Sequence, residues 1–401
     1  MLLWKKRLLT LTDSIKILEK HANNPSGLVP EGLFCCIRGQ MKKILTFFLV
    51  VLIVFPLFGC APAQKYEKYS GEFLDTFDTS VIVMAYARSQ EEFDDIYNTV
   101  YDTFTELNMQ YDIYHDYDGV NNIKSINDNA GIAPVKADLA IIDMLKMSMD
   151  WYDKTDGIVN VAMGSVLSIW HDYRDAGQYD PSKAELPPMD QLQDAAKHTD
   201  IDDVIIDEQA STVYLNDSRM SLDVGAVAKG YATEVAADKL IEKGYDSVLI
   251  SAGGNIRAIG TPKDGVRSKW SVGIKDPDSP LAGSTDESNL LDVAFVTNLS
   301  VVSSGIYERF YTVNGMNYHH LIDPKTLMPA DYYKAVTVIT ENSGQADLLS
   351  TTLFLMPPEQ SLDYAESLNG VEALWVMPDN EILMTSGMKS MLRDIGGASY
   401  N

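Results

Sequence analysis

The stretch Ser221-Leu-Asp-Val-Gly-Ala-Val-Ala-Lys-Gly-Tyr231 predicts a strand that turns through small residues into a helix, Ala228–Leu240, in a chain of 401 residues. A helix that begins after a glycine turn presents unpaired backbone N–H groups and the positive end of its dipole. Phosphate is the usual ligand at such a point. Asp223 would add a metal or ribose partner, and Lys229 a cation. An ordinary strand-to-helix turn without a ligand explains the pattern equally well.

Helices dominate the early part of the chain and short strands the later part. A strand is expected at Ser80–Ala87, and apolar residues then recur at helical spacing from Phe93 to Leu107. A second helix fits Leu139–Tyr152, with Asp138 as its N-cap. Later strands are expected at Val204–Ile206, Val213–Leu215, Ser247–Ser251, Trp270–Ile274, Val293–Val296, Phe310–Val313, Val336–Ile339 and Ala373–Val376, with helices at Ala228–Leu240, Gln345–Leu355 and Pro358–Leu368. This order predicts one α+β domain with a largely antiparallel sheet flanked by helices.

Two segments show no clear periodicity. Residues 60–72 are polar and are interpreted as a tether, which places the folded domain at residues 73–395. The stretch from Tyr173 to Asp200 is rich in Pro and Asp and is interpreted as a surface excursion of that domain.

Asp347 and Thr351 lie four residues apart in a segment that is helical by pattern. Their oxygens would therefore project from one face of the helix. A carboxylate and a hydroxyl, with a few backbone carbonyls, form the oxygen shell that Mg²⁺ accepts beside a substrate phosphate. A solvated helix start with Asp347 near the N-cap is the alternative.

His319 and His320 precede Leu-Ile-Asp-Pro at the expected end of a strand. Neighbours on a strand point to opposite faces, so at most one of them should face a pocket. Histidine suits general-base chemistry near neutral pH, but without further context a purely structural role is the more common explanation of such a histidine.

Two runs of small residues follow expected strands: Ser251-Ala-Gly-Gly-Asn-Ile-Arg257 and Val302-Ser-Ser-Gly-Ile-Tyr307. Paired glycines permit either tight sheet geometry or close approach to a ligand. The chain has no Gly-x-Gly-x-x-Gly after a strand, no Gly-Lys-Ser/Thr phosphate loop and no Gly-x-Ser-x-Gly elbow. The common nucleotide-binding folds and the serine hydrolase elbow are therefore not supported.

Residues 41–59 have the pattern of a bacterial lipoprotein signal peptide. Two lysines precede an apolar run that is too short to span a bilayer comfortably, and Gly59 precedes Cys60. Cys60 is the expected lipidation site, which predicts attachment to the extracytoplasmic face of the cell membrane. A short membrane anchor that stays uncleaved is the alternative. Residues 1–40 lie upstream of this complete signal and are interpreted as an extension added by a misplaced start codon, with a genuine cytosolic extension as the alternative.

The net charge of the whole chain is −25, and residues 1–59 carry an excess of cations, so the remainder is still more acidic. This composition argues against nucleic acid as a partner and offers no polybasic attraction to anionic lipid. Lipid on Cys60 would have to provide membrane attachment. If the chain is cleaved before Cys60, this residue is the one cysteine of the mature chain. Because it would carry lipid, no disulfide would stabilise the core.

Taken together and in order, the motifs resemble those of the ApbE family, the exported FAD:protein FMN transferases. The resemblance covers about Phe73 to Met391. It is carried by Tyr111-Asp-Ile-Tyr-His-Asp-Tyr-Asp-Gly-Val-Asn-Asn-Ile-Lys-Ser-Ile-Asn127, Thr155-Asp-Gly-Ile-Val-Asn160, Asp223-Val-Gly-Ala-Val-Ala-Lys-Gly230, Gly253-Gly-Asn-Ile-Arg257, His319-His-Leu-Ile-Asp-Pro324 and Ala346-Asp-Leu-Leu-Ser-Thr351.

The resemblance implies Mg²⁺-dependent transfer of the FMN half of FAD onto a threonine or serine hydroxyl of an exported acceptor protein, with release of AMP. It assigns the role of general base to His320. It assigns Mg²⁺ binding to Ala226, Asp347, Ser350 and Thr351, and FAD contact to Phe77, Tyr114, Ile158, Val159, Asn160, Asp223, Lys229 and Ile322.

Three positions depart from the family pattern. Phe77-Asp78-Thr79 stands where many relatives have Met-Gly-Thr, Asn160 stands where aspartate is common, and Leu327 replaces the usual glycine after Asp-Pro-Lys-Thr. None of these changes removes His320 or a proposed metal ligand. An aromatic ring at Phe77 and an amide at Asn160 would alter the contacts with the flavin.

Two other functions compete with the transferase. With water in place of the acceptor hydroxyl, the same site would act as an FAD pyrophosphatase that yields FMN and AMP. A lipid-anchored flavin-binding protein would bind FAD without reaction. By family analogy the acceptor would be a subunit of a membrane redox complex or a secreted flavoprotein.

Overall fold

The structure is a computed structural model that describes residues 65–279 and 287–401, and Tyr66–Asn401 form one compact unit. The signal peptide at 41–59, the extension at 1–40 and lipidation at Cys60 lie outside the described residues and stay predictions. Within the described residues, no helix is both long and apolar enough to cross a membrane.

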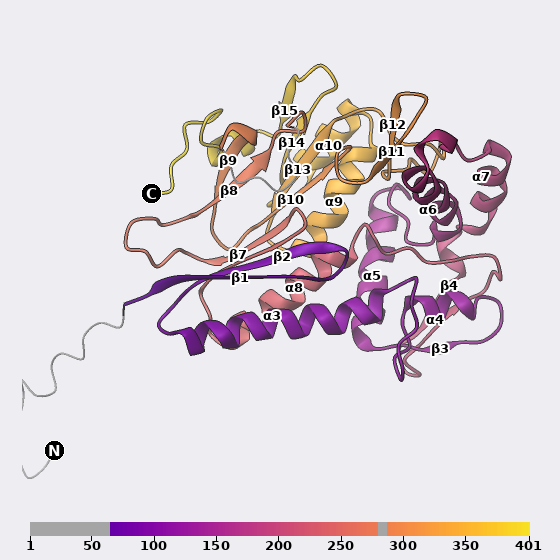
Figure 1. The fold of residues 1–401 in the computed structure, drawn as a ribbon, viewed down its shortest axis with the longest axis horizontal. Helices are drawn as coiled ribbons and strands as arrows, with labels where there is room; N and C mark the ends of the chain where they lie inside the picture. The colour runs from indigo at the N-terminus through magenta and orange to yellow at the C-terminus, as the bar shows by residue number, and fades with distance from the viewer. Residues whose placement is uncertain (1–64, 280–286) are drawn as a thin grey trace, which may run out of the picture. The chain divides into compact units, whose positions relative to one another are not determined.

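An eight-stranded sheet is the largest element of the described part, and all its neighbouring strands are antiparallel (Figure 1). In spatial order its strands are β1 (Glu67–Thr76), β2 (Thr79–Ala87), β6 (Ser247–Ala252), β7 (Asn255–Gly260), β10 (Ser300–Gly305), β13 (Ala335–Thr340), β14 (Glu372–Val376) and β15 (Ile382–Met384). The prediction of an α+β fold with a largely antiparallel sheet is confirmed.

Helices and smaller sheets complete the fold. The helices are α3 (Gln90–Tyr111), α4 (Ile123–Asp128), α5 (Leu139–Lys154), α6 (Gly164–Tyr179), α7 (Met189–Ala195), α8 (Ala228–Glu242), α9 (Ser343–Leu355) and α10 (Pro358–Ser367). The smaller sheets pair β3 (Val135–Lys136) with β5 (Thr212–Leu215) and β5 with β4 (Val204–Asp207), β8 (Trp270–Lys275) with β9 (Leu290–Val296), and β11 (Phe310–Val313) with β12 (Met316–His319).

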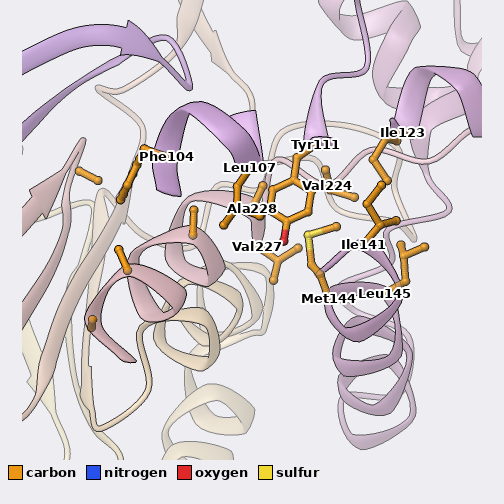
Figure 2. Packing of buried hydrophobic residues seen from close by; sticks show 14 of the residues in the cluster. Phe104, Leu107, Tyr111, Ile123, Ile141, Met144, Leu145, Val224, Val227 and Ala228 are labelled. Carbon is orange, nitrogen blue, oxygen red and sulfur yellow. The ribbon is translucent and has the colours of Figure 1, made fainter. Parts of the chain in front are cut away.

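Helix α3 forms where the sequence predicts it, because its apolar residues recur on one face and its start is capped. The Ser89 side chain accepts a hydrogen bond from the backbone N–H of Glu92. Phe104, Leu107 and Tyr111 are buried on the inner face. Figure 2 shows these side chains beside those of α5 and of the turn before α8. The turn that carries Asp223 is thus fixed by the hydrophobic core.

Helix α9 is buried along nearly its whole length and packs against α8 and against strands β10 and β13. A buried ion pair joins helix α8 to strand β7 of the sheet: Nε of Arg257 on β7 lies 3.2 Å from Oε2 of Glu234 on α8. The same carboxylate accepts a 2.6 Å hydrogen bond from the backbone N–H of Ser343, the first residue of α9. One acid on α8 therefore holds both β7 and the start of α9.

The structure corrects several boundaries. The tether predicted at residues 60–72 is wrong from Glu67 onward, because β1 begins there. The surface excursion predicted from Tyr173 to Asp200 contains the end of α6 and all of α7. Leu192 of α7 is fully buried in a cluster with Trp170 of α6. Burial of single apolar residues, rather than periodicity, holds this region in place.

Replacement of Glu234 by alanine should destabilise the fold by about 3–5 kcal/mol, because it leaves the buried Arg257 guanidinium without its counterion. Urea unfolding would measure the loss. Glu242→Ala, at an exposed position of the same helix, is the matched control and should change stability by less than about 0.5 kcal/mol. Equal effects of the two substitutions would contradict a structural role for the ion pair.

Candidate active site

A cavity of about 710 Å³ brings together nearly all the site residues predicted from the sequence. The predicted residues that line it are Phe77, Tyr114, Ile158, Val159, Asn160, Asp223, Ala226, Lys229, His320, Ile322, Asp347 and Thr351. Ser350 is not among the lining residues, and Cys60 lies outside the described part of the chain.

The start of α8 forms one wall of this cavity. The residues before it are not the strand that the sequence predicted, because Ser221 makes only an isolated bridge to Met163. Asp223 instead forms a turn: its Oδ1 accepts a 2.9 Å hydrogen bond from the N–H of Gly225. Helix α8 has no side-chain cap at Val227. The Ala228 N–H donates to the Val224 carbonyl and the Gly230 N–H to Asp347 Oδ2, so among the described residues only the Lys229 N–H of the first three has no partner.

Asp347 of α9 faces the start of α8. Its Oδ2 accepts a 2.8 Å hydrogen bond from the N–H of Gly230 and lies 3.9 Å from Lys229 Nζ. Within the described residues, Oδ1 has no hydrogen bond. The carboxylate is therefore fixed through one oxygen and has the other available at the cavity.

Ala226 and Thr351 line the same cavity, whereas Ser350 lies behind it. The Ser350 hydroxyl donates to the backbone carbonyl of Asp347 at 2.8 Å and lies 2.7 Å from the Ser304 hydroxyl. Ser350 is fully buried. Its hydroxyl is engaged by the protein, so it supports the Asp347 backbone and does not line the cavity.

His320 lines the cavity and is held in one tautomer. Its Nδ1 lies 3.2 Å from the backbone carbonyl oxygen of Arg309. A carbonyl only accepts, so Nδ1 carries the hydrogen and Nε2 of the neutral ring has a free lone pair. Burial lowers the pKa of His320 to about 3, and the nearby charges of Arg309, His319 and Lys229 act in the same direction. The ring is therefore a neutral acceptor at physiological pH.

His319 points the other way and has a structural role. Its Nε2 donates to the Ala330 carbonyl at 2.8 Å, and its Nδ1 accepts a hydrogen bond from the Leu321 N–H. Burial lowers its pKa as well. The expectation that only one of the two histidines faces a pocket is confirmed.

Two of the three departures from the family pattern, at Phe77-Asp78 and at Leu327, occupy left-handed backbone conformations. Phe77 and Asp78 form the two-residue turn between β1 and β2, with φ of 53° and 51°. The Phe77 N–H donates to Asn108 Oδ1 at 2.7 Å. Leu327 has a φ of 61°, is buried, and accepts a 3.0 Å hydrogen bond from the Trp170 indole at its carbonyl.

Asn160 uses its side chain to shape the cavity wall. Its amide donates to the Thr199 carbonyl at 2.8 Å and accepts from the Ala162 N–H at 2.8 Å. The side chain is therefore fixed by the protein. The neighbouring Ile158 and Val159 are buried and provide an apolar surface on which an aromatic ring can pack.

The sequence did not reveal His171, which also lines the cavity. Its Nδ1 lies 3.0 Å from the hydroxyl of Tyr114 and its Nε2 lies 3.7 Å from Asp223 Oδ2. Burial lowers the pKa of His171. His171 and Arg174 lie three residues apart on α6 and both reach the cavity. That spacing was the available signal, but α6 itself was not predicted.

Comparison with known proteins identifies the family. The ApbE family model matches residues 77–375. The chain belongs to the ApbE family. The FAD:protein FMN transferase of Treponema pallidum is 30% identical over 368 residues, which cover 88% of this chain and 97% of that protein. That of Klebsiella pneumoniae is 28% identical over 284 residues, which cover 68% of this chain and 81% of that protein.

Solved structures of ApbE proteins share the fold. The ApbE protein of Thermotoga maritima has a TM-score of 0.70 at 25% identity and covers 82% of this chain and 100% of that one. The flavin transferase ApbE of Vibrio cholerae has a TM-score of 0.65 at 21% identity, with the same coverage of both chains. The chain is therefore a transferase with a single ApbE fold.

Replacement of His320 by glutamine should make folding less sensitive to acid. The pKa of this imidazole is ordinarily 6.5 and falls to about 3 in the folded protein. Between these two pH values the unfolded chain therefore binds more protons than the folded chain. Stability therefore falls as the pH is lowered through this range, by up to about 1.4 kcal/mol per pH unit for one group.

Urea unfolding of both proteins at pH 7 and pH 5 would measure this effect. The wild-type chain should lose more stability than His320→Gln. Equal losses would show that the imidazole is not held neutral in the fold.

Proposed function

We propose that this chain transfers the FMN half of FAD to a threonine or serine hydroxyl of an acceptor protein and releases AMP. The observation that carries the proposal is a neutral His320, with Nε2 free, in the same cavity as the start of α8 and Asp347. Relatives named FAD:protein FMN transferase support the same reaction.

In this reaction the acceptor hydroxyl oxygen attacks the phosphorus of the FMN half. The bond from that phosphorus to the bridging oxygen breaks, and AMP leaves with that oxygen. His320 Nε2 accepts the hydroxyl proton, since its Nδ1 hydrogen is held by the Arg309 carbonyl. Lys229 and the positive end of the α8 dipole stabilise the negative charge of the phosphates.

The oxygen donors of the cavity fit Mg²⁺. The carboxylate of Asp347, the hydroxyl of Thr351 and the carbonyl of Ala226 would hold the ion. When bound, Mg²⁺ would neutralise phosphate charge and make AMP a better leaving group. The described residues contain no group of three or more His, Cys, Asp or Glu side chains suited to a metal, so water and phosphate oxygens would complete the shell.

We also propose that the signal at 41–59 directs export and that lipid on Cys60 attaches the enzyme to the extracytoplasmic face of the cell membrane. The acceptor would then be an exported flavoprotein or a subunit of a membrane redox complex. The acidic composition of the chain supports attachment through lipid rather than through surface charge.

The decisive experiment incubates the chain from Ala61, which retains the compact unit Tyr66–Asn401, with FAD, Mg²⁺ and a threonine-bearing acceptor domain. The mass of the denatured acceptor should rise by one phosphoester-linked FMN, and AMP should appear in equal amount. Accumulation of AMP and free FMN with an unmodified acceptor would support the pyrophosphatase instead. Unchanged FAD with every acceptor tried would support a binding protein.

His320→Ala should lower the rate of transfer at least about 100-fold, because no base accepts the hydroxyl proton. FAD affinity, measured by flavin fluorescence, should stay within about threefold, since the ring is not needed to hold the phosphates. His198→Ala changes a histidine outside the cavity lining and is the matched control. Loss of FAD binding together with transfer would count against a role as base.

Asp347→Asn should remove the Mg²⁺ dependence of FAD binding. An asparagine oxygen can still accept the hydrogen bond from Gly230, so the contact between the helices is kept while the charge is lost. FAD titrations with Mg²⁺ and with EDTA would measure the effect. Asp363→Asn, at an exposed acid of α10, is the control. An equal Mg²⁺ effect in all three proteins would refute the metal assignment.

A further inference from the structure

Asn255 has a buried amide without a partner. It is the first residue of β7, is 2% exposed, and lines the cavity. Its Nδ2 has no hydrogen-bond partner among the described residues. An amide N–H buried without an acceptor costs about 1–3 kcal/mol, so native proteins rarely leave one unused.

The sheet directs this amide toward the helices. Asn255 and Arg257 are two residues apart on β7 and therefore share a face, and Arg257 pairs with Glu234 of α8. On the neighbouring strand β10, Val302 lies opposite Asn255. Two residues farther along β10 on the same face, Ser304 contacts Ser350 of α9. The amide is therefore on the side of the sheet that α8 and α9 cover.

No neighbouring polar side chain accepts a hydrogen bond from the amide in the structure, and the nearest hydroxyls bond to one another instead. The Ser303 hydroxyl lies 2.8 Å from the Thr337 hydroxyl, and the Ser304 hydroxyl lies 2.7 Å from that of Ser350. Ser303 and Ser304 also line the cavity. Because Asn255 lines the cavity, a ligand bound there can supply the missing acceptor.

We propose that the Asn255 amide donates a hydrogen bond to a phosphoryl oxygen of the bound dinucleotide. The chemistry of the cavity favours an anionic oxygen, because the start of α8 and Lys229, which also line it, attract negative charge. The inference rests on the proposed function, since it assigns one more contact to the same FAD. The backbone before Asn255 allows the approach: Gly253 and Gly254 have φ of 52° and 93°, which glycine adopts without strain.

The test measures binding with a His320→Ala background, so that FAD is not consumed. The probes are FAD, ADP as a diphosphate without flavin, and riboflavin as a flavin without phosphate. Asn255→Ala should lower the affinity for FAD and for ADP by about tenfold or more. This is the effect of losing one hydrogen bond to a charged group. Riboflavin affinity should not change. Asn255→Asp should lower the affinity for FAD and ADP further, because it places a negatively charged carboxylate beside their phosphates.

Ser303→Ala is the matched control, since it removes a hydroxyl of the same cavity that already has a partner. It should leave all three affinities unchanged. Melting temperatures would show that each variant is folded. Equal FAD affinity in Asn255→Ala and its parent would overturn the inference and leave the transferase intact. An equal loss of riboflavin affinity in Asn255→Ala would overturn the assignment of the amide to a phosphate. A parent chain that binds neither FAD nor ADP would overturn both the inference and the proposed function.

Discussion

The close contact between α8 and α9 at Gly230 is the constraint on which the site depends. A Cβ atom at this position would lie 2.4 Å from the Asp347 Cβ and 2.4 Å from the Ser343 carbonyl oxygen, so only glycine lets the helices approach this closely. The approach brings the Gly230 N–H to the Asp347 carboxylate. Glu234, one turn farther along α8, also holds the first residue of α9. An acid and a helix N-terminus from distant parts of the chain therefore share one cavity.

The chemistry of the site could be predicted where it depends on local patterns. The turn at Asp223 and the helix that follows it, the spacing of Asp347 and Thr351, and the alternation of His319 and His320 are all local, and the structure brings the predicted cavity residues together. Ser350 shows the limit of such reasoning. Positions three and four residues after Asp347 fit one helix face equally well, and only packing against Ser304 of β10 separates them.

What the sequence missed depends on contacts between distant segments. Helix α6 has no side-chain cap at its start, and Gly164 lies against Ser221, where a Cβ would come within 2.5 Å of a backbone oxygen. His171 and Arg174 could not be placed without that helix. Strand β1 was missed because most of its residues are exposed on the outermost strand of the sheet, where polar side chains resemble a tether. The sequence assigned no role to Asn255, because only the structure shows which groups surround its side-chain amide and that none of them bonds to it.

The two left-handed turns have opposite consequences for engineering. Asp78 is exposed, so the glycine common in the family would relieve its backbone strain without loss of packing. Leu327 is also left-handed, but its side chain is buried in the cluster around Trp170. Glycine there would remove apolar burial of about 1.5–3 kcal/mol, more than the strain that it relieves. A consensus design that averages relatives would therefore strengthen one turn and weaken the other.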